Sequence, residues 1–382
     1  MKTYLIASVI VLMTFILTIN AKADEMKTSP LDGIKLKSLA YIDYSNGKTG
    51  LVNDADTGYN QFSLTRGYFT LEKELQPWMG MRLTMDLTQD DDGDYKVRQK
   101  YFYAALKPKD LGFLTGMSSE IGLGHIPWLD FEEHINPYRC QGTMAIERAG
   151  VLNSADVGIS LMGSFGGKLT DAKSKTGNDH YDGLYGSWHI GIYNGSGYHA
   201  KEVNENKVPE ARVTLRPLPE VLPGLQLSYF GVFGKGNTLE APDYIVNMGM
   251  ISLEHPMVIL TGQFMMTEGN AKGTWIDESG KALKTQGFSA FGQFRIPDSR
   301  LAVFGRVDYF DTDADNVIVS DKSAYTTFIG GLSYSLYKSN MILVTFETTD
   351  YDENVAGKGK IPAAGTMLGK DQKVQMVYQI SF

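Results

Sequence analysis

The stretch Lys373-Val374-Gln375-Met376-Val377-Tyr378-Gln379-Ile380-Ser381-Phe382 decides the fold class. Side chains in a strand point alternately to opposite faces, so this stretch has one apolar, aromatic face and one mainly polar face. Lipid offers the backbone no hydrogen bonds, so a sheet in a bilayer must close on itself and turn every second side chain toward hydrocarbon. The pattern predicts the closing strand of an outer-membrane barrel; the alternative is an edge strand of a soluble sandwich. The apolar face carries Val374, Met376, Tyr378, Ile380 and Phe382.

The same alternation recurs along the chain. Between residues 79 and 87, methionine and leucine side chains fall on one face, while Arg82, Thr84 and Asp86 fall on the other. A basic side chain that faced mid-bilayer lipid would cost about 2–4 kcal/mol, so the charged face must be the interior face. We therefore expect a lumen that is charged and rich in Thr, Ser and Gln. Comparable splits occur at 156–161, 211–216, 288–296 and 301–309.

The inward positions supply candidates for a pore wall. The basic candidates are Arg66, Arg82, Arg98, Lys100, Arg212, Arg216, Arg295, Arg306 and Lys373. Fewer acids oppose them, namely Glu72, Asp86, Asp156, Asp308 and Glu347. The wall is therefore mildly basic inside an acidic protein. The alternative for any one arginine is a neutralised pair, as Arg306 with Asp308 or Arg82 with Asp86 would allow, so the sequence leaves ion preference open.

Connection lengths give the strand count and the orientation. About sixteen segments have close to the 9 to 11 residues that a tilted strand needs to cross a bilayer. Short turns belong on the periplasmic side and long loops outside. Tight turns are expected at 254–256, 297–299 and 337–339, and long loops at about 46–58, 127–153, 195–207, 269–285, 311–322 and 350–371. The long polar segment 166–183 breaks this rule, so it is either a local insertion or a sign that the count is wrong by two strands.

The first 23 residues have the features of a cleaved signal peptide. A basic start at Lys2 precedes an apolar run over residues 5–19, and Ala21-Lys22-Ala23 offers the small residues that a signal peptidase requires. A retained anchor is the alternative. We expect export to the outer membrane and a single barrel domain over 24–382, because no later segment is long and apolar enough for a transmembrane helix.

Charge and cysteine content exclude several classes of partner. Residues 1–23 contain two lysines and no acid, so the rest of the chain carries 34 basic and 44 acidic side chains, a net charge of −10. Such a balance argues against a nucleic-acid partner. The only cysteine is Cys140, which rules out an intrachain disulfide and a lipoprotein attachment site after the signal. We expect no cofactor.

Several short motifs in the first half of the chain occur in a specific order. Ile121-Gly122-Leu123-Gly124-His125-Ile126-Pro127-Trp128 precedes Ile146-Glu147-Arg148 and then Asp156-Val157-Gly158, with Gly163 shortly after. Phe62-Ser63-Leu64-Thr65-Arg66-Gly67-Tyr68-Phe69 lies before them, and Ile192-Tyr193-Asn194-Gly195-Ser196-Gly197, Asn206-Lys207 and Arg212 follow. Together these residues, within about 59–217, resemble the phosphate-selective porin O and P family of Gram-negative outer membranes.

The resemblance implies a sixteen-stranded barrel, usually trimeric, that forms a water-filled channel for small hydrophilic solutes and ions. It also implies that the third external loop folds inward and narrows the pore. Here that loop would begin at Pro127, where a residue without an N–H ends a strand. Its charged side chains become candidates for the constriction: Asp130, Glu132, Glu133, Arg139 and Arg148. The alternative is a solvated surface loop.

Phosphate specificity does not follow from the resemblance, because a phosphate path needs several closely placed Arg or Lys side chains. The expected partners are outer-membrane lipid, two further copies of the chain, and the barrel-assembly machinery, which would recognise the closing strand ending at Phe382. Other functions compete with the channel. The stretch Met162-Gly163-Ser164-Phe165-Gly166 lacks the first glycine of a serine-hydrolase motif, which argues against an enzyme.

A metal site built from His125, His134, Cys140, Glu132 and Glu133 would match none of the usual zinc spacings. A gated carrier of hydrophobic substrates would need an apolar lumen. An adhesin or structural barrel would be expected to plug its lumen or to carry an anchoring domain. The sequence favours a channel over all of these.

Overall fold

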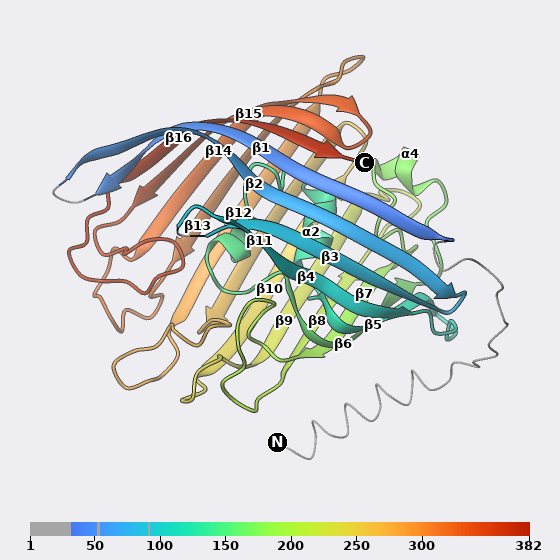
Figure 1. Ribbon diagram of the computed structural model, residues 1–382, viewed down its shortest axis with the longest axis horizontal. Helices are drawn as coiled ribbons and strands as arrows, with labels where there is room; N and C mark the ends of the chain where they lie inside the picture. The colour runs from blue at the N-terminus through green and yellow to red at the C-terminus, as the bar shows by residue number, and fades with distance from the viewer. Residues whose placement is uncertain (1–31, 52–53, 91) are drawn as a thin grey trace.

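The chain forms a closed antiparallel β-barrel (Figure 1). The computed structural model describes residues 32–51, 54–90 and 92–382. The predicted signal peptide and its cleavage point after Ala23 lie outside these residues. The described residues form sixteen strands: β1 (Ile34–Leu51), β2 (Asp54–Gln76), β3 (Met79–Gln89), β4 (Tyr95–Leu106), β5 (Leu114–His125), β6 (Ala155–Phe165), β7 (Gly186–Tyr193), β8 (Val208–Leu215), β9 (Leu225–Lys235), β10 (Asp243–Glu254), β11 (Val258–Glu268), β12 (Lys284–Arg295), β13 (Leu301–Asp311), β14 (Ala324–Tyr337), β15 (Asn340–Tyr351) and β16 (Lys370–Ser381).

The C-terminal stretch closes the barrel, as its alternation predicts. β16 pairs with β1 in an antiparallel register that sets Gln379 opposite Tyr41. The backbone of Phe382 exchanges two hydrogen bonds with Ser38, at 3.1 and 3.2 Å. Val374 and Phe382 are exposed on the outer face, whereas Val377 points inward and is fully buried. The predicted sixteen-stranded barrel is confirmed.

Connections alternate in length as predicted, with one error. The turns at 255–257, 296–300 and 338–339 are short and lie at the end of the barrel that also holds the C-terminus, here called the turn end. The predicted loop at 46–58 is wrong, because β1 continues to Leu51 and β2 starts at Asp54. Their backbones remain paired from Gly47 with Tyr59 to Thr49 with Thr57. The polar residues there belong to a paired hairpin in which Asn46, Lys48 and Asn60 are exposed.

The segment between β6 and β7 is an insertion and does not alter the strand count. Residues 166–185, here called the turn-end insertion, contain the short helix α4 (Ala172–Thr176) and lie near the C-terminus in Figure 1. The strands on either side of this segment, β6 and β7, pair directly with each other. The segment is therefore a connection between neighbours, and the count stays at sixteen strands. Of the two readings of its length, the local insertion is the correct one.

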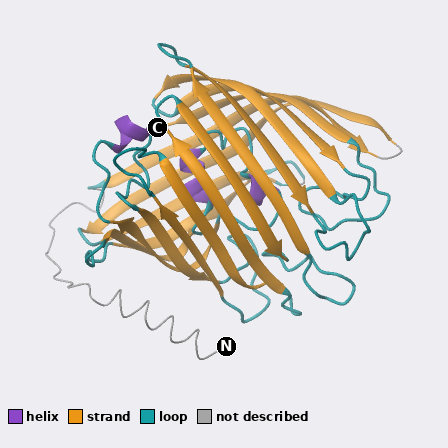
Figure 2. Ribbon diagram, turned by 180° about the vertical axis from the view of Figure 1, so that it is seen from behind, coloured by secondary structure: helices purple, strands orange, loops and turns teal. Residues whose placement is uncertain are grey.

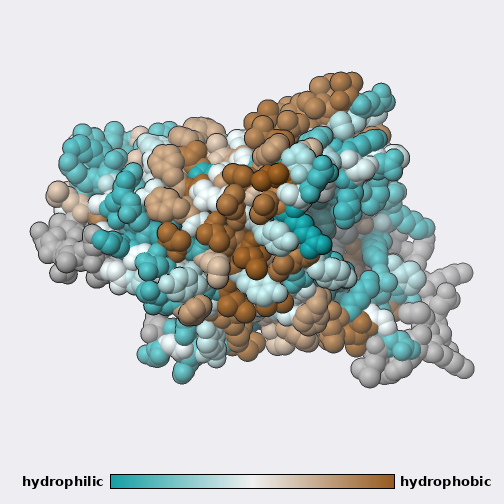
Figure 3. Space-filling view, turned by 90° about the horizontal axis from the view of Figure 1, so that it is seen from above, coloured by the Kyte–Doolittle hydropathy of each residue, from teal (hydrophilic) through white to brown (hydrophobic). Residues whose placement is uncertain are grey.

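The outer face is apolar, and half of the inner face is apolar as well. Hydrophobic side chains form a band across the middle of the molecule, with hydrophilic groups toward both ends (Figure 3). Between β9 and β14, however, many inward side chains are also apolar and buried, so the predicted uniformly polar lumen is wrong for this half. They include Phe230, Val232, Tyr244, Val246, Met248, Met250, Met265, Phe291, Phe304 and Phe310. No helix among the described residues is long and apolar enough to span a bilayer.

Candidate functional site

The long connection between β5 and β6 folds into the barrel (Figures 1 and 2). This inward loop, residues 126–154, contains α2 (Leu129–Ile135) and α3 (Ala145–Arg148). It reaches the far wall, where the hydroxyl of Tyr138 lies 2.8 Å from Ser333 Oγ and the amide of Gln141 donates to Glu347 over 2.6 Å. The position matches the inward loop that the resemblance implies, beginning beside Pro127.

Residues of the first motif hold the start of the inward loop. The carboxylate of Glu120 accepts hydrogen bonds from the backbone N–H of His125 over 2.8 Å and lies 2.9 Å from its Nδ1. A Cβ at Gly124 would stand 2.6 Å from that carboxylate, so a larger residue there would force the Glu120 side chain away from His125. Arg212 donates to the carbonyl of Pro127 over 3.0 Å, with its guanidinium 4.2 Å from the centre of the Phe131 ring.

The later motifs hold the end of the loop. Asp156, the first polar residue of β6, accepts hydrogen bonds from the backbone N–H groups of Val157 and Gly195. Asn153 donates to the carbonyl of Ser196 over 3.2 Å. A Cβ at Gly197, which has a φ of 88°, would collide with the Asn153 side chain. The motif residues thus come together as a frame around the two ends of the loop.

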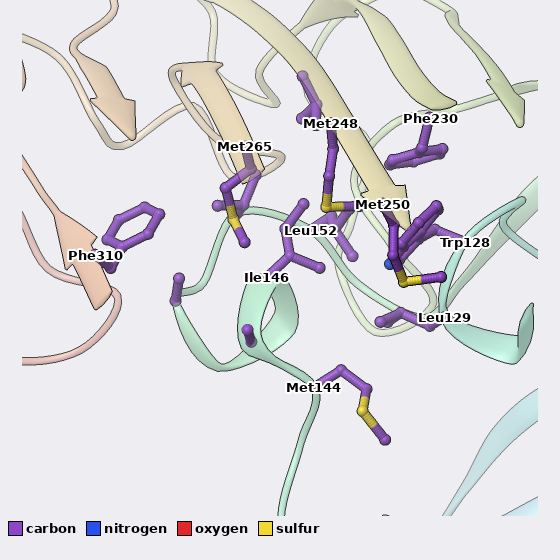
Figure 4. Packing of buried hydrophobic residues seen from close by; sticks show 14 of the residues in the cluster. Trp128, Leu129, Met144, Ile146, Leu152, Phe230, Met248, Met250, Met265 and Phe310 are labelled. Atoms are coloured by element: carbon purple, nitrogen blue, oxygen red, sulfur yellow. The ribbon is translucent and has the colours of Figure 1, made fainter. Parts of the chain in front are cut away.

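One side of the inward loop packs against the apolar wall of β9–β14 (Figure 4). Trp128 and Ile146 are fully buried, and the Trp128 ring centre lies 5.5 Å from that of Phe230. Tyr138 stacks on Phe304 at 3.8 Å between ring centres. Cys140 is buried in the same cluster, and burial raises the pKa of its thiol to about 12. This side, here called the packed face, closes the loop against the wall that it covers.

Glu132 belongs to the packed face. Its carboxylate accepts from the Trp128 indole N–H over 2.7 Å and from the Gln263 amide over 3.0 Å. Burial raises the pKa of Glu132 to about 7, although these two hydrogen bonds oppose the shift. A carboxyl enclosed in this way is poorly placed to meet a passing ion.

The other side of the loop is charged. Arg139 donates to Glu133 over 2.7 Å and to Glu147 over 3.2 Å. Burial raises the pKa of Glu133, while the guanidinium groups of Arg139 and Arg66 oppose that rise. Arg66 lies on β2 opposite Tyr41 of β1. This charged face of the loop therefore looks toward the wall formed by β1–β4.

That wall carries four of the predicted basic residues. Arg66, Arg82, Arg98 and Lys100 project from β2, β3 and β4, and tyrosine rings lie between them. Arg98 pairs with Asp86 at 2.9 Å. The alternative pairing of Arg82 with Asp86 is wrong, because Arg82 donates to Thr84 over 3.2 Å instead. A register shift between Thr84 and Met85 brings Arg98 directly opposite Asp86.

The remaining predicted arginines support the loop and the insertion. Arg306 pairs with Asp308 at 2.5 Å, the neutralised pair that the sequence offers as an alternative, and also donates to the carbonyl of Thr143 over 3.0 Å. Arg148 pairs with Glu347 at 3.0 Å. Arg216 donates to the carbonyl of Gly183 in the turn-end insertion over 3.1 Å. Arg306, Arg148 and Arg216 therefore make their contacts away from the cations on β2–β4.

A cavity of about 720 Å³ opens below the inward loop at the turn end. It is bordered by Tyr41, Glu133 and Arg139 on one side and by Arg295, Arg300 and Lys338 on another. The turn-end insertion forms part of its lining, since the Asn178 amide donates to the carbonyl of His134 over 2.9 Å and the Tyr181 hydroxyl to Asp130 over 2.5 Å. The cavity connects the turn end with the charged face.

Asp130 and His134 form the contact between the loop and the insertion. His134 Nδ1 lies 2.6 Å from the Asp130 carbonyl and 3.4 Å from its carboxylate, and its ring centre lies 3.9 Å from that of His180. Burial lowers the pKa of His134, but the bonds and charge of Asp130 outweigh it and raise the pKa to about 9. Within the described part of the chain, no group of three or more His, Cys, Asp or Glu side chains is placed to hold a metal ion.

Sequence reasoning missed the tyrosines of the wall. Tyr68 stands two residues after Arg66, and Tyr101 and Tyr103 stand two residues apart on β4, all pointing inward. Because residues at i and i+2 share a strand face, an arginine and a tyrosine at this spacing were a usable signal. Tyr198 carried no such signal, since it reaches the wall from the loop between β7 and β8.

Comparisons with known proteins support the fold. No protein-family model and no curated protein sequence matches the chain. Among solved structures, OmpF of Salmonella typhi in complex with daunomycin aligns with a TM-score of 0.58 at 11% identity, covering 91% of this chain and 97% of that one. The outer membrane channel DcaP of Acinetobacter baumannii aligns at 0.55 and 11%, with the same coverage.

The trimer form of OmpT, an outer membrane protein of Vibrio cholerae, aligns with a TM-score of 0.53 at 11% identity, covering 92% of this chain and all of that one. None of these three structures is described as a porin O or P, so they do not confirm the resemblance to that family. The chain has the sixteen-stranded barrel fold of Gram-negative outer-membrane porins.

Proposed function

We propose that the protein is an outer-membrane porin through which small hydrophilic solutes and ions diffuse between the inward loop and the β1–β4 wall. The observation that carries the proposal is the difference between the two sides of the loop. The packed face seals against β9–β14, whereas Glu133 and Arg139 on the charged face border the cavity at the turn end. The long loops would face the outside and the turn end the periplasm.

Opposite charges across this passage would set its ion preference. Glu133 and Glu147 lie on the loop, and Arg66 and Arg82 lie on the wall. In a narrow, partly desolvated space such charges act more strongly on an ion than they would in bulk water. The porin O and P resemblance does not carry phosphate specificity to this chain, and the wall cations are the residues that any permeating anion would meet.

The rival functions have less support. A carrier of hydrophobic substrates would use the apolar inward residues, but the inward loop buries Phe230 and Met248 instead of leaving them open. The aligned solved structures include one described as an outer membrane channel. For assembly we propose export through the predicted signal peptide, a homotrimer like the aligned trimer form, and recognition of β16 and Phe382 by the barrel-assembly machinery.

Reversal potentials across a planar bilayer under a KCl gradient test the proposal. Replacing Glu133 and Glu147 by Gln removes two negative charges from the charged face, and the potential should move toward anion preference. A charge about 8 Å from an ion contributes roughly 0.5–1 kcal/mol at an effective dielectric constant of about 40–80, or about two- to sixfold in permeability ratio. Arg66→Gln with Arg82→Gln should move the potential in the opposite direction.

Glu132→Gln is the matched control, because Glu132 lies on the same loop but on the packed face. It should leave the reversal potential unchanged. If the wild-type protein forms no channels, the porin proposal fails. If Glu132→Gln shifts the potential as far as the double variant does, the proposed passage is in the wrong place.

A further inference from the structure

The β2–β4 wall alternates cations with tyrosine rings. The guanidinium carbon of Arg66 lies 5.0 Å from the centre of the Tyr68 ring, and that of Arg82 lies 4.8 Å from Tyr101. At the edge nearer the long loops, Arg98 and Lys100 both lie over the ring of Tyr198, at 5.1 and 3.9 Å. We call these seven residues the tyrosine–cation wall. Each cation rests on at least one aromatic face, an attractive contact that also fixes its orientation.

The guanidinium groups of this wall keep their charge. Arg98 is paired with Asp86, but no carboxylate of the described residues forms an ion pair with Arg66 or Arg82. Their polar contacts are neutral oxygens, the Tyr68 hydroxyl for Arg66 and Thr84 Oγ1 for Arg82. A guanidinium does not lose its proton in a protein, so both positions remain cationic at any working pH.

The spacing of the charges suits one kind of anion better than another. Inorganic phosphate is strongly hydrated, and a site that strips it of water needs several donors converging on one point. Here Arg66 lies over Tyr68 and Arg82 lies over Tyr101, so each guanidinium is held against a ring of its own. A solute with a single carboxylate and a flat ring would use both elements, since the carboxylate pairs with one arginine and the ring rests on a neighbouring tyrosine.

The wall begins beside the cavity at the turn end. Tyr41, which borders the cavity of about 720 Å³, is the direct strand neighbour of Arg66. That volume lies within the range of pockets that hold small organic molecules. The same cavity is lined by four arginine and lysine cations, Arg139, Arg295, Arg300 and Lys338, and by two acids, Asp130 and Glu133. An organic anion would therefore meet cations both in the cavity and on the wall.

We propose that the tyrosine–cation wall is a binding stretch for small organic monoanions that carry a planar ring, of the class of aromatic carboxylates, and that inorganic phosphate is a poor ligand there. The proposal deepens the porin function and rests on it. Aromatic contacts of this kind contribute about 0.5–1.5 kcal/mol beyond burial, which corresponds to about two- to tenfold in dwell time for each ring face engaged.

Single-channel recording with three probe anions tests the proposal. Benzoate has the ring and the carboxylate, acetate has the carboxylate alone, and inorganic phosphate has the higher charge without a ring. Added at equal concentration to wild-type channels, benzoate should interrupt the current for at least about fivefold longer than acetate, with phosphate no longer than acetate. Tyr68→Leu with Tyr198→Leu should remove most of that difference, because these two rings are partly exposed whereas Tyr101 is buried. Arg82→Gln should shorten the interruptions by benzoate and acetate alike.

Tyr229→Leu is the control, because Tyr229 lies on the outer face of β9 and is half exposed there. It should keep the wild-type dwell times. Channels that conduct but do not distinguish benzoate from acetate would refute the binding stretch and leave the porin function intact. Longer interruptions by phosphate than by benzoate would show a phosphate-type filter and would also overturn the proposal. A wild-type protein that does not conduct would refute the porin function itself.

Discussion

The packed face and the charged face of the inward loop lie on one short segment and follow different physical rules. On the packed face, Trp128 and Ile146 are fully buried, and the burial of their apolar surface stabilises the docked loop. On the charged face, Arg139 pairs with Glu133 and Glu147, and Glu133 and Arg139 border the open cavity. One face attaches the loop, and the other is the face that we propose acts on solutes, so the two roles can be tested separately.

The largest expected effect comes from breaking the packed face. Trp128→Ala removes a fully buried side chain and its hydrogen bond to Glu132, and such a truncation typically costs about 3–5 kcal/mol. The inward loop should then detach from the β9–β14 wall for part of the time. Brief trypsin digestion of the folded barrel should then cut after Arg139 or Arg148, which the mass of the fragments would show.

Leu239→Ala is the control for Trp128→Ala, because Leu239 is a large apolar residue that is 82% exposed in the loop between β9 and β10. It should resist trypsin as the wild-type protein does. A Trp128→Ala protein that resists equally well would mean that the packed face does not hold the loop.

A smaller, pH-dependent effect should distinguish Glu132 from the acids of the charged face. Its pKa is raised from 4.5 to about 7, so the folded state disfavours the ionised carboxyl. Stability should therefore fall as pH rises from about 4.5 to 7, by up to roughly 3 kcal/mol from this group. Glu132→Gln should flatten this part of the profile when heat unfolding of the barrel is followed by gel mobility. A wild-type profile that rises over the same interval would contradict the assignment.

The smallest effect concerns the contact between the loop and the turn-end insertion. Because the pKa of His134 is raised to about 9, its stabilising charge is fully present below about pH 6.5 and is lost as pH rises through about 9. Asp130→Asn should remove this dependence. Both side chains are partly exposed, so the change should stay below about 1 kcal/mol, or about 2 °C in unfolding temperature.

The heat-unfolding scan at pH 7 and at pH 10 measures the contribution of Asp130. The wild-type protein should lose more stability than Asp130→Asn between these two values. Lys173→Gln serves as a control, since Lys173 in α4 forms only a long, exposed pair with Asp179 at 3.6 Å. Equal losses in wild type and Asp130→Asn would show that His134 does not carry the effect.

The sequence predicted the barrel better than its interior. Alternation in β16 identifies the membrane face directly, because charges are excluded from lipid and the period is two. The same rule cannot tell whether an inward side chain meets water or another segment. Consecutive apolar residues such as Val232-Phe233 and Tyr244-Ile245-Val246 were the available signal, since a strand that is apolar on both faces loses its alternation.

The charged residues of the site show the same limit. The sequence grouped all five acids and arginines of the inward loop as one constriction, yet Glu132 and Arg148 turn toward the far wall while Glu133 and Arg139 do not. Neighbouring residues on a short helix point in different directions, and which one meets the passage depends on how the loop docks. That docking is set by tertiary packing, which the spacing of residues within the loop does not reveal.

The single cysteine of the chain gives the inward loop a natural reporter. Cys140 is buried against the packed face, and its raised pKa keeps the thiol protonated there. A maleimide added to the folded protein can react only after the inward loop has exposed Cys140 to water. The labelling rate therefore reports how often the loop opens. The barrel therefore needs no engineered probe, and the frequency with which the loop opens is measurable in the unmodified protein.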